Sequence, residues 1–144
     1  FFTKTKQKSI TENFSNDEIN EFKSDLVLSS AVIEHVGSQN NQEKMIENIF
    51  KLTKKIFIIT TPNRGYPVDF HTKIPFLHWL PKKVHRKILG FVGMSFFSKE
   101  ENLNLLSRND IHSYLRKYPL NYKIIDLKLL GLSSNFIIIG KIKN

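Results

Sequence analysis

The sequence predicts an α/β fold, and three segments in the first half of the chain carry the prediction. Residues 25–30 (DLVLSS) and 56–61 (IFIITT) are short apolar runs typical of buried strands, and the second is rich in β-branched residues. Between them, residues 41–52 carry Met45, Ile49 and further apolar side chains at helical spacing. Because crossovers within one sheet are right-handed, this order predicts two parallel strands with the helix on one face.

The segment after the second strand is expected to be an insertion between core elements. Residues 62–106 contain four prolines, and within this range only residues 81–89, with proline at the first position, favour a helix. A capping pattern at Ser107–Asp110 then predicts a helix that continues to about Lys117. We therefore expect the chain to return to its core at residue 107.

The C-terminal part of the chain predicts a strand pair, and the N-terminal part predicts little regular structure. Residues 122–130 and 136–142 are apolar strands, and the five residues 131–135 between them favour an antiparallel hairpin. Residues 1–24 are polar and lysine-rich, and we expect a weakly structured segment with one helix start at Ser15.

Length and composition indicate a single domain over residues 1–144, with 40% hydrophobic residues to form its core. The absence of cysteine excludes disulfides, thiolate metal ligands and a cysteine nucleophile, and is typical of a reducing cytoplasm. No apolar run has the length of a membrane span, and Phe1–Lys4 lacks the features of a signal peptide. These observations predict a soluble, cytoplasmic protein.

The net charge of +9 favours anionic partners. The positive charge is spread along the chain, however, and eighteen of the 22 basic residues are lysines. A nucleic-acid partner is therefore not expected, because such binding needs a focused basic surface.

Two motifs add a family resemblance. Asp25–Val36 (DLVLSSAVIEHV) resembles the fourth-strand motif of class I S-adenosylmethionine (SAM)-dependent methyltransferases, an FD-V-hydrophobic strand followed by LEHV. Thr61–Arg64 resembles the tip of their fifth strand, and residues 71–81 resemble small-molecule methyltransferases of the UbiE and type 11 kind. Over residues 23–142 the resemblance implies the C-terminal half of a Rossmann-like fold, a mostly parallel sheet with a C-terminal antiparallel strand pair.

One part of the family pattern is missing from this sequence. The family holds the methionine part of SAM against a glycine-rich turn and its ribose with an acidic residue, both of which precede the fourth strand. The six glycines here form no G-x-G. Close backbone approach to a ligand requires glycine, so we expect this chain alone to bind SAM weakly or not at all, and to be inactive.

The resemblance implies that Ser29, Ser30, Ala31 and Val32 line the SAM cofactor just past the first of the two strands. Small side chains at this position would let a ligand approach the backbone. The alternative is that these residues only end a strand.

Two histidines are candidate general bases, because the ordinary pKa of histidine lies near neutrality. His35 lies at the turn into the crossover helix, and His71 follows the second strand. A packed imidazole bonded to a backbone group is the alternative for His35, and a solvated loop residue is the alternative for His71.

No metal site is expected from the sequence. Some quinone-pathway relatives bind a divalent ion through a Glu-x-x-Glu-His pattern, but Ala31 occupies the position of the first glutamate. His71, His78 and His85 recur at intervals of seven, yet prolines interrupt any helix that would align them.

Arg64, Tyr66 and Asp69 follow the second strand tip and are candidate substrate-binding residues. Arg64 could bind a carboxylate or a phosphate. A proline-rich surface loop also carries such residues without any ligand, which is the alternative.

Residues 74–81, which include the candidate substrate residue Trp79, form an apolar patch, and a basic patch follows at residues 82–87. This pattern suits a lid over the substrate side, a lipid-like substrate or peripheral contact with a membrane. We expect residues 62–106 to serve as the lid.

The resemblance implies SAM-dependent methyl transfer to a small, hydrophobic or lipid-like acceptor when the domain is complete. A non-catalytic α/β interaction module is the first alternative, and a remnant that binds membranes or nucleic acid is the second. Absence of the preceding strands would leave residues 25–30 with an open edge. We expect residues 9–14 or a second copy of the chain to cover it.

Overall fold

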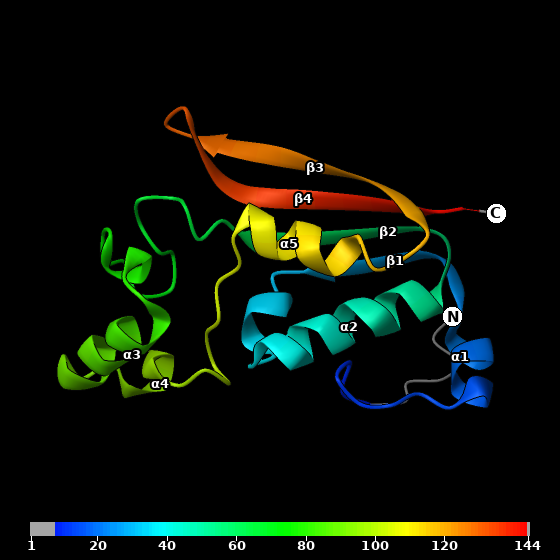
Figure 1. The fold of residues 1–144 in the computed structure, drawn as a ribbon, viewed down its shortest axis with the longest axis horizontal. Helices are drawn as coiled ribbons and strands as arrows, with labels where there is room; N and C mark the ends of the chain where they lie inside the picture. The colour runs from blue at the N-terminus through cyan, green and yellow to red at the C-terminus, as the bar shows by residue number, and fades with distance from the viewer. Residues whose placement is uncertain (1–7, 144) are drawn as a thin grey trace, which may run out of the picture.

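The computed structural model describes residues 8–143, so Phe1–Lys4, on which the expectation about a signal peptide depends, lies outside the described residues. Its central feature is a four-stranded sheet in the order β1-β2-β4-β3 (Figure 1). The strands are β1 (Ser24–Ser30), β2 (Thr53–Pro62), β3 (Leu120–Leu129) and β4 (Leu132–Ile142). The predicted α/β fold is confirmed.

Strand direction divides the sheet into two parts. β1 and β2 are parallel, whereas β4 is antiparallel to both β2 and β3. Within the four-stranded sheet of residues 8–143, parallel pairing is thus confined to β1 and β2, because the C-terminal hairpin inserts β4 next to β2. The predicted strand-helix-strand unit and the predicted antiparallel pair are both present.

The helices are α1 (Asn16–Phe22), α2 (Gln39–Leu52), α3 (Lys82–Phe91), α4 (Ser95–Ser98) and α5 (Arg108–Leu115), with 3-10 turns η1 (Ile33–His35) and η2 (Leu77–Trp79). Ser107 begins α5 with the predicted capping box, and Ser15, predicted as a helix start, begins α1 with a capping box of the same kind. Pro81 is the N-cap of α3. No helix in residues 8–143 combines the length and apolar character needed to cross a membrane.

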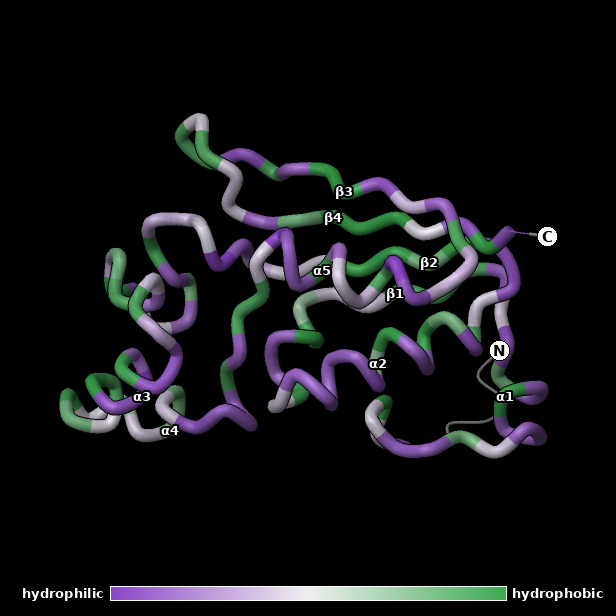
Figure 2. Tube along the Cα trace, in the orientation of Figure 1, coloured by the Kyte–Doolittle hydropathy of each residue, from purple (hydrophilic) through white to green (hydrophobic). Residues whose placement is uncertain are grey.

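The core lies between one face of the sheet and the helices α2 and α5. It includes Met45 and Ile49 of α2, Phe57 of β2, Leu115 of α5 and Phe136 of β4, each at most 2% exposed. Figure 2 shows continuous hydrophobic stretches along β2 and β4, where β-branched and aromatic residues alternate between the two faces. Burial of this apolar surface is the main stabilising contribution.

The hairpin between β3 and β4 differs from the expected five-residue connection over residues 131–135. Only Leu130 and Gly131 separate the two strands, and their φ angles are 52° and 80°. Positive φ at both central residues is typical of a type I′ turn, whose twist matches that of paired strands. Residues 132–135 consequently belong to β4.

The N-terminal segment does not cover the edge of β1 in the expected way. The Asn48 side chain of α2 donates to the carbonyls of Ile10 and Glu12 at 2.6 and 2.8 Å, which holds this segment on α2 and leaves it unpaired with β1. Leu26 and Leu28 of β1 are 55% and 65% exposed. Among the described residues, β1 is an edge strand with apolar side chains open to solvent.

Residues 63–106, with η2, α3 and α4, lie beyond the carboxyl ends of β1 and β2 (Figure 1). The predicted insertion is therefore placed next to the edge of the sheet where open α/β folds bind ligands.

Candidate functional site

The carboxyl ends of β1 and β2 lie side by side, as the sequence predicted. Ser30 pairs with Thr60 in the parallel register, and their hydroxyl oxygens are 2.9 Å apart. The Ala31 N–H donates to the Thr60 carbonyl at 3.0 Å, with Ala31 in the left-handed region at φ 52°. This bond turns the chain away from the sheet into η1, which begins the site.

Glu34, His35 and His71 form a cluster just past these strand ends. One ligand-type atom from each residue lies within 4.8 Å of the other two. The Nε2 atoms of His35 and His71 are 3.2 Å apart, and His35 Nε2 is 3.9 Å from Glu34 Oε1. The two histidines predicted as bases, 36 residues apart in the chain, thus face each other.

His71 is held by the buried carboxylate of Asp69. This carboxylate accepts from the His71 ring at 3.0 Å and the His71 backbone at 3.1 Å, and also from the Thr72 hydroxyl at 2.7 Å. Burial favours a higher pKa of Asp69, but these hydrogen bonds outweigh burial and hold its pKa far below the ordinary range. The hydrogen bond that the His71 ring donates to Asp69 raises the pKa of His71 against the effect of burial, and the charges of Asp69 and Glu34 raise it further.

Glu34 is fully buried, and its two oxygens have different surroundings. Oε2 accepts a hydrogen bond from the Thr61 hydroxyl at 2.9 Å. Oε1 has no hydrogen-bond partner within residues 8–143. A buried carboxylate oxygen without a partner is rare in folded proteins and marks a place where a ligand or an ion can bind.

A polar network behind the cluster fixes the position of η1. The Gln42 amide nitrogen of α2 donates to the carbonyls of Ile33 and Asn104 at 3.1 and 2.7 Å, and its oxygen accepts from Tyr114 at 3.2 Å. The Asn104 backbone N–H donates to the Glu34 carbonyl at 2.7 Å. These bonds connect α2, α5 and the end of the insertion to the turn that carries Glu34.

Three of the four predicted cofactor residues line one groove. Ser29, Ser30 and Val32 line it together with Val27 and Leu28 of the open strand and with Ile10, Met45 and Ile49. Ser29 is buried, and its hydroxyl has no hydrogen-bond partner in the described part of the chain. Ala31 lies between these residues in sequence but does not line the groove.

The predicted substrate residues have separate placements. Arg64 donates to the carbonyls of His78 and Leu80 at 3.3 and 3.1 Å, and with the half-exposed Trp79 it lines a shallow hollow. Tyr66 is buried, and its ring stacks on Phe70 with a centroid distance of 5.3 Å. Asp69 accepts a hydrogen bond from His71 and is therefore the predicted substrate residue that adjoins the Glu34–His35–His71 cluster.

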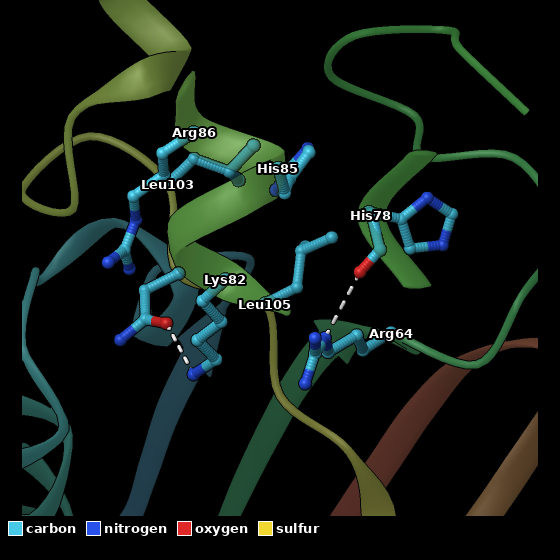
Figure 3. A pocket seen from close by; sticks show the side chains of 8 residues that line it. Arg64, His78, Lys82, His85, Arg86, Leu103 and Leu105 are labelled. Carbon is cyan, nitrogen blue, oxygen red and sulfur yellow. Dashed lines mark hydrogen bonds between the residues drawn. The ribbon is translucent and has the colours of Figure 1, made fainter. Parts of the chain in front are cut away.

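Figure 3 shows a small basic cavity lined by eight residues, among them Arg64, His78, Lys82, His85 and Arg86. The Lys82 ammonium donates to the Asn104 side chain at 2.6 Å. The cavity is about 10 Å³, which is room for a single water. His78 and His85 line this cavity while His71 faces His35, so the three histidines spaced by seven residues do not converge.

The lowered pKa of His85 predicts that the stability of the protein depends on pH. Burial lowers its pKa, and although Asp69 opposes the shift, the charges of His78, Arg64 and Arg86 reinforce it. The unfolded chain therefore takes up the proton first, and the free energy of unfolding falls as the pH decreases from about 6.5 through the lowered pKa.

Urea unfolding of the wild type and of His85→Gln between pH 5 and 7.5 tests this pH dependence. The variant is expected to lose less stability than the wild type at the acidic end. Equal pH slopes for the two proteins would contradict the assignment. Taking the difference between them removes the opposite contribution of His71, which both proteins share.

No protein-family profile and no curated protein matches the sequence. Solved structures do match in fold. Magnesium protoporphyrin IX methyltransferase from Synechocystis PCC 6803 with bound SAH superposes with a TM-score of 0.52 at 12% identity, over 94% of this chain and 49% of that one. Human N-acetylserotonin methyltransferase in complex with SAM gives a TM-score of 0.54 at 11% identity, over 96% of this chain and 33% of that one.

A SAM-dependent methyltransferase structure from Methanosarcina mazei gives a TM-score of 0.55 at 10% identity, over 94% of this chain and 65% of that one. The chain has the fold of the class I SAM-dependent methyltransferases, as the motifs predicted. It spans about half the length of the Synechocystis enzyme.

Proposed function

We propose that this chain supplies the acceptor side and the reacting groups of a SAM-dependent methyltransferase. The observation that supports the proposal is the position of the Glu34–His35–His71 cluster. It lies just past the paired ends of β1 and β2, and the end of β1 also contributes Ser29 and Ser30 to the groove. Open α/β folds bind their ligands at this edge of the sheet.

The groove supplies some of the contacts that an adenosyl ligand needs, but not the glycine-rich turn that the family uses to hold SAM. The Ser29 hydroxyl, which is buried and has no hydrogen-bond partner among residues 8–143, is proposed to bond to a ligand in the groove, and Val27 and Ile49 offer apolar contact. Bound SAM supplies a methyl group on a sulfonium whose leaving group is a neutral thioether. A G-x-G turn is missing from the sequence, so we expect the isolated chain to bind SAM or SAH only at millimolar concentrations.

The residues of this chain would orient the acceptor and remove its proton. His35 Nδ1 lies 2.7 Å from the Asn102 carbonyl and His71 Nδ1 lies 3.0 Å from Asp69, so the ring hydrogens of the neutral imidazoles lie on Nδ1. The two Nε2 atoms, which are 3.2 Å apart, are proposed to share a proton taken from an acceptor hydroxyl or amine. Arg64 and Trp79 in the neighbouring hollow are proposed to contact a small, hydrophobic or lipid-like acceptor. Alignment of donor and acceptor accounts for several kcal/mol of the barrier in such reactions, on the order of 7 or more in favourable cases.

The experiment is titration of the ¹⁵N-labelled chain with SAH, followed by amide chemical shifts. We expect millimolar SAH to shift the amides of residues 29–32. Ser30→Phe, which fills the groove, should abolish these shifts, whereas Arg64→Ala, in the hollow beyond it, should preserve them. Shifts scattered over the surface, or none at 10 mM SAH, would refute the proposed cofactor side.

A non-catalytic interaction module is the second candidate, and the open strand β1 favours it. Leu26 and Leu28 on this edge strand are more than half exposed, an arrangement that invites pairing with another strand. A second copy of the chain is the proposed occupant. Sedimentation of wild type and Leu26→Lys would then differ, the wild type dimerising at micromolar concentration and the variant remaining monomeric.

Peripheral contact with a membrane is proposed for the insertion. Phe76, Trp79, Phe91 and Phe96 are each at least half exposed there, and Lys83 lies among them in sequence. Flotation with anionic vesicles tests this contact. Phe91→Ser combined with Phe96→Ser should reduce the bound fraction, and equal binding of wild type and variant would contradict it.

A further inference from the structure

We propose that Glu34, His35 and His71 bind one divalent transition-metal ion. The inference that the ion binds is independent of the proposed function, and only its role in methyl transfer rests on that function. Two imidazoles and one carboxylate are a common ligand set for Zn²⁺, Fe²⁺, Mn²⁺ and Co²⁺, and less suited to Mg²⁺ or Ca²⁺, which prefer oxygen.

The separations of the ligand atoms fit a shared ion. Ligands that lie about 2.0–2.2 Å from an ion lie about 2.9–3.6 Å from one another in tetrahedral or octahedral geometry. The two histidine Nε2 atoms are 3.2 Å apart, and His35 Nε2 is 3.9 Å from Glu34 Oε1. The first separation is within this range, the second is about 0.3 Å beyond it, and no pair of ligand atoms in the group is more than 4.8 Å apart.

The hydrogen bonds on the far side of each ring leave the near side without protons. The Asn102 carbonyl can only accept, so His35 Nδ1 carries the ring hydrogen, and the Asp69 carboxylate has the same effect on His71 Nδ1. In their neutral forms the two imidazoles therefore direct Nε2 lone pairs at each other. The fully buried Glu34 Oε1, which lacks a hydrogen-bond partner within residues 8–143, is the third electron-rich atom of the group. A cation between these atoms removes the repulsion.

The surroundings of the three residues match those of ligands in known metal sites. Metal-binding histidines usually donate their other ring hydrogen to a carboxylate or a backbone carbonyl, which orients the ring and raises its basicity. Asp69 and the Asn102 carbonyl are such acceptors here. The Thr61 hydroxyl orients Glu34 by donating a hydrogen bond to its Oε2. His35 is exposed, so water or an acceptor oxygen can reach the remaining coordination positions.

A bound ion would also give the site a chemical role. A hydroxyl coordinated to a divalent cation has a much lower pKa than a free hydroxyl, so the acceptor would lose its proton more readily at neutral pH. In the metal-bound site the two Nε2 lone pairs are donated to the ion, so the ion would bind and activate an oxygen acceptor and the proton would leave to water.

Titration of tag-free, metal-free protein with Co²⁺, followed by visible absorption, tests the inference. The wild type should bind one equivalent and develop the ligand-field bands of a histidine-bound cobalt ion. His35→Gln and His71→Gln should each weaken binding by at least about 100-fold, and Asp69→Asn, which removes an orienting group, by about 10–100-fold. His112→Gln is the matched control, because His112 bonds to Tyr122 away from the cluster.

Several results would overturn the inference: no ligand-field bands, binding that survives in His35→Gln and His71→Gln, or an equal loss in His112→Gln. Circular dichroism checks that each variant is folded, and His35→Gln is the safest variant because its side chain is exposed. The two proposals fail separately. Cobalt binding without any SAH-induced shift at residues 29–32 would contradict the proposed function alone, and SAH shifts without cobalt binding would contradict the metal site alone.

Discussion

Phe57→Ala is expected to lower the free energy of unfolding by about 3–5 kcal/mol. Phe57 lies on β2 near the centre of the sheet and is 1% exposed, so its truncation leaves a cavity that the rigid strands on either side cannot fill. Urea unfolding at neutral pH measures the loss. Phe57→Leu, which keeps most of the volume, is the matched control and should lose less than half as much.

The Phe57 ring also determines how a substitution of its cross-strand partner, Gly140, is expected to change stability. A Cβ atom on Gly140 would lie 2.1 Å from the Phe57 ring, so Gly140→Ala in the wild type is expected to destabilise by about 1–3 kcal/mol. In the Phe57→Ala background the added methyl has space, and the same change should cost nothing. Additive effects in the double variant would contradict this packing. Gly90→Ala in α3 is the control, because the nearest atoms to a Cβ on Gly90 are 3.8 Å away.

Gln42→Met is expected to lower the free energy of unfolding by about 2–4 kcal/mol. The substitution keeps the length of the side chain but leaves the carbonyls of Ile33 and Asn104 and the Tyr114 hydroxyl without their partner. Because Gln42 is 1% exposed, water does not replace the lost bonds without opening the core. Urea unfolding measures this loss as well.

Gln42→Met should also affect the Glu34–His35–His71 cluster, although the hydrogen bonds of the Gln42 side chain go to Ile33, Asn104 and Tyr114 and to none of the three cluster side chains. Gln42 holds the carbonyl of Ile33, the first residue of η1, and η1 also carries Glu34 and His35. Loss of this bond is expected to loosen η1 and to weaken cobalt binding by about tenfold or more. Tyr114→Phe, which removes one hydrogen bond of the same network, is the control and should lose only about 0.5–1.5 kcal/mol. Equal stability and equal cobalt affinity in the two variants would show that the network does not position η1.

The fold was predictable wherever one local pattern determines one element. The apolar runs at 25–30 and 56–61 predicted strands, the spacing from Met45 to Leu52 predicted an amphipathic helix, and Ser107 with Asp110 predicted a helix start. The expectation that residues 25–30 are buried was wrong, because β1 is the edge strand and most of its side chains are exposed. Right-handed crossover then placed both strand ends at one edge. The hairpin turn was missed, because the positive φ of Leu130 is enforced by the pairing of β3 with β4 and has no local signal in that residue.

The candidate site was only half predictable. His35 and His71 were recognised singly from their motifs, but their meeting at 3.2 Å depends on an irregular, proline-rich segment without periodicity. Neither the burial of Glu34 nor the contact between Asp69 and His71 has a signal in the sequence, because both result from the folding of that segment against η1. The sequence by itself determined the strands and the edge at which the carboxyl ends of the parallel pair meet, since hydrophobic periodicity is local. Only the tertiary structure decided which polar groups share that edge, since long-range packing selects them.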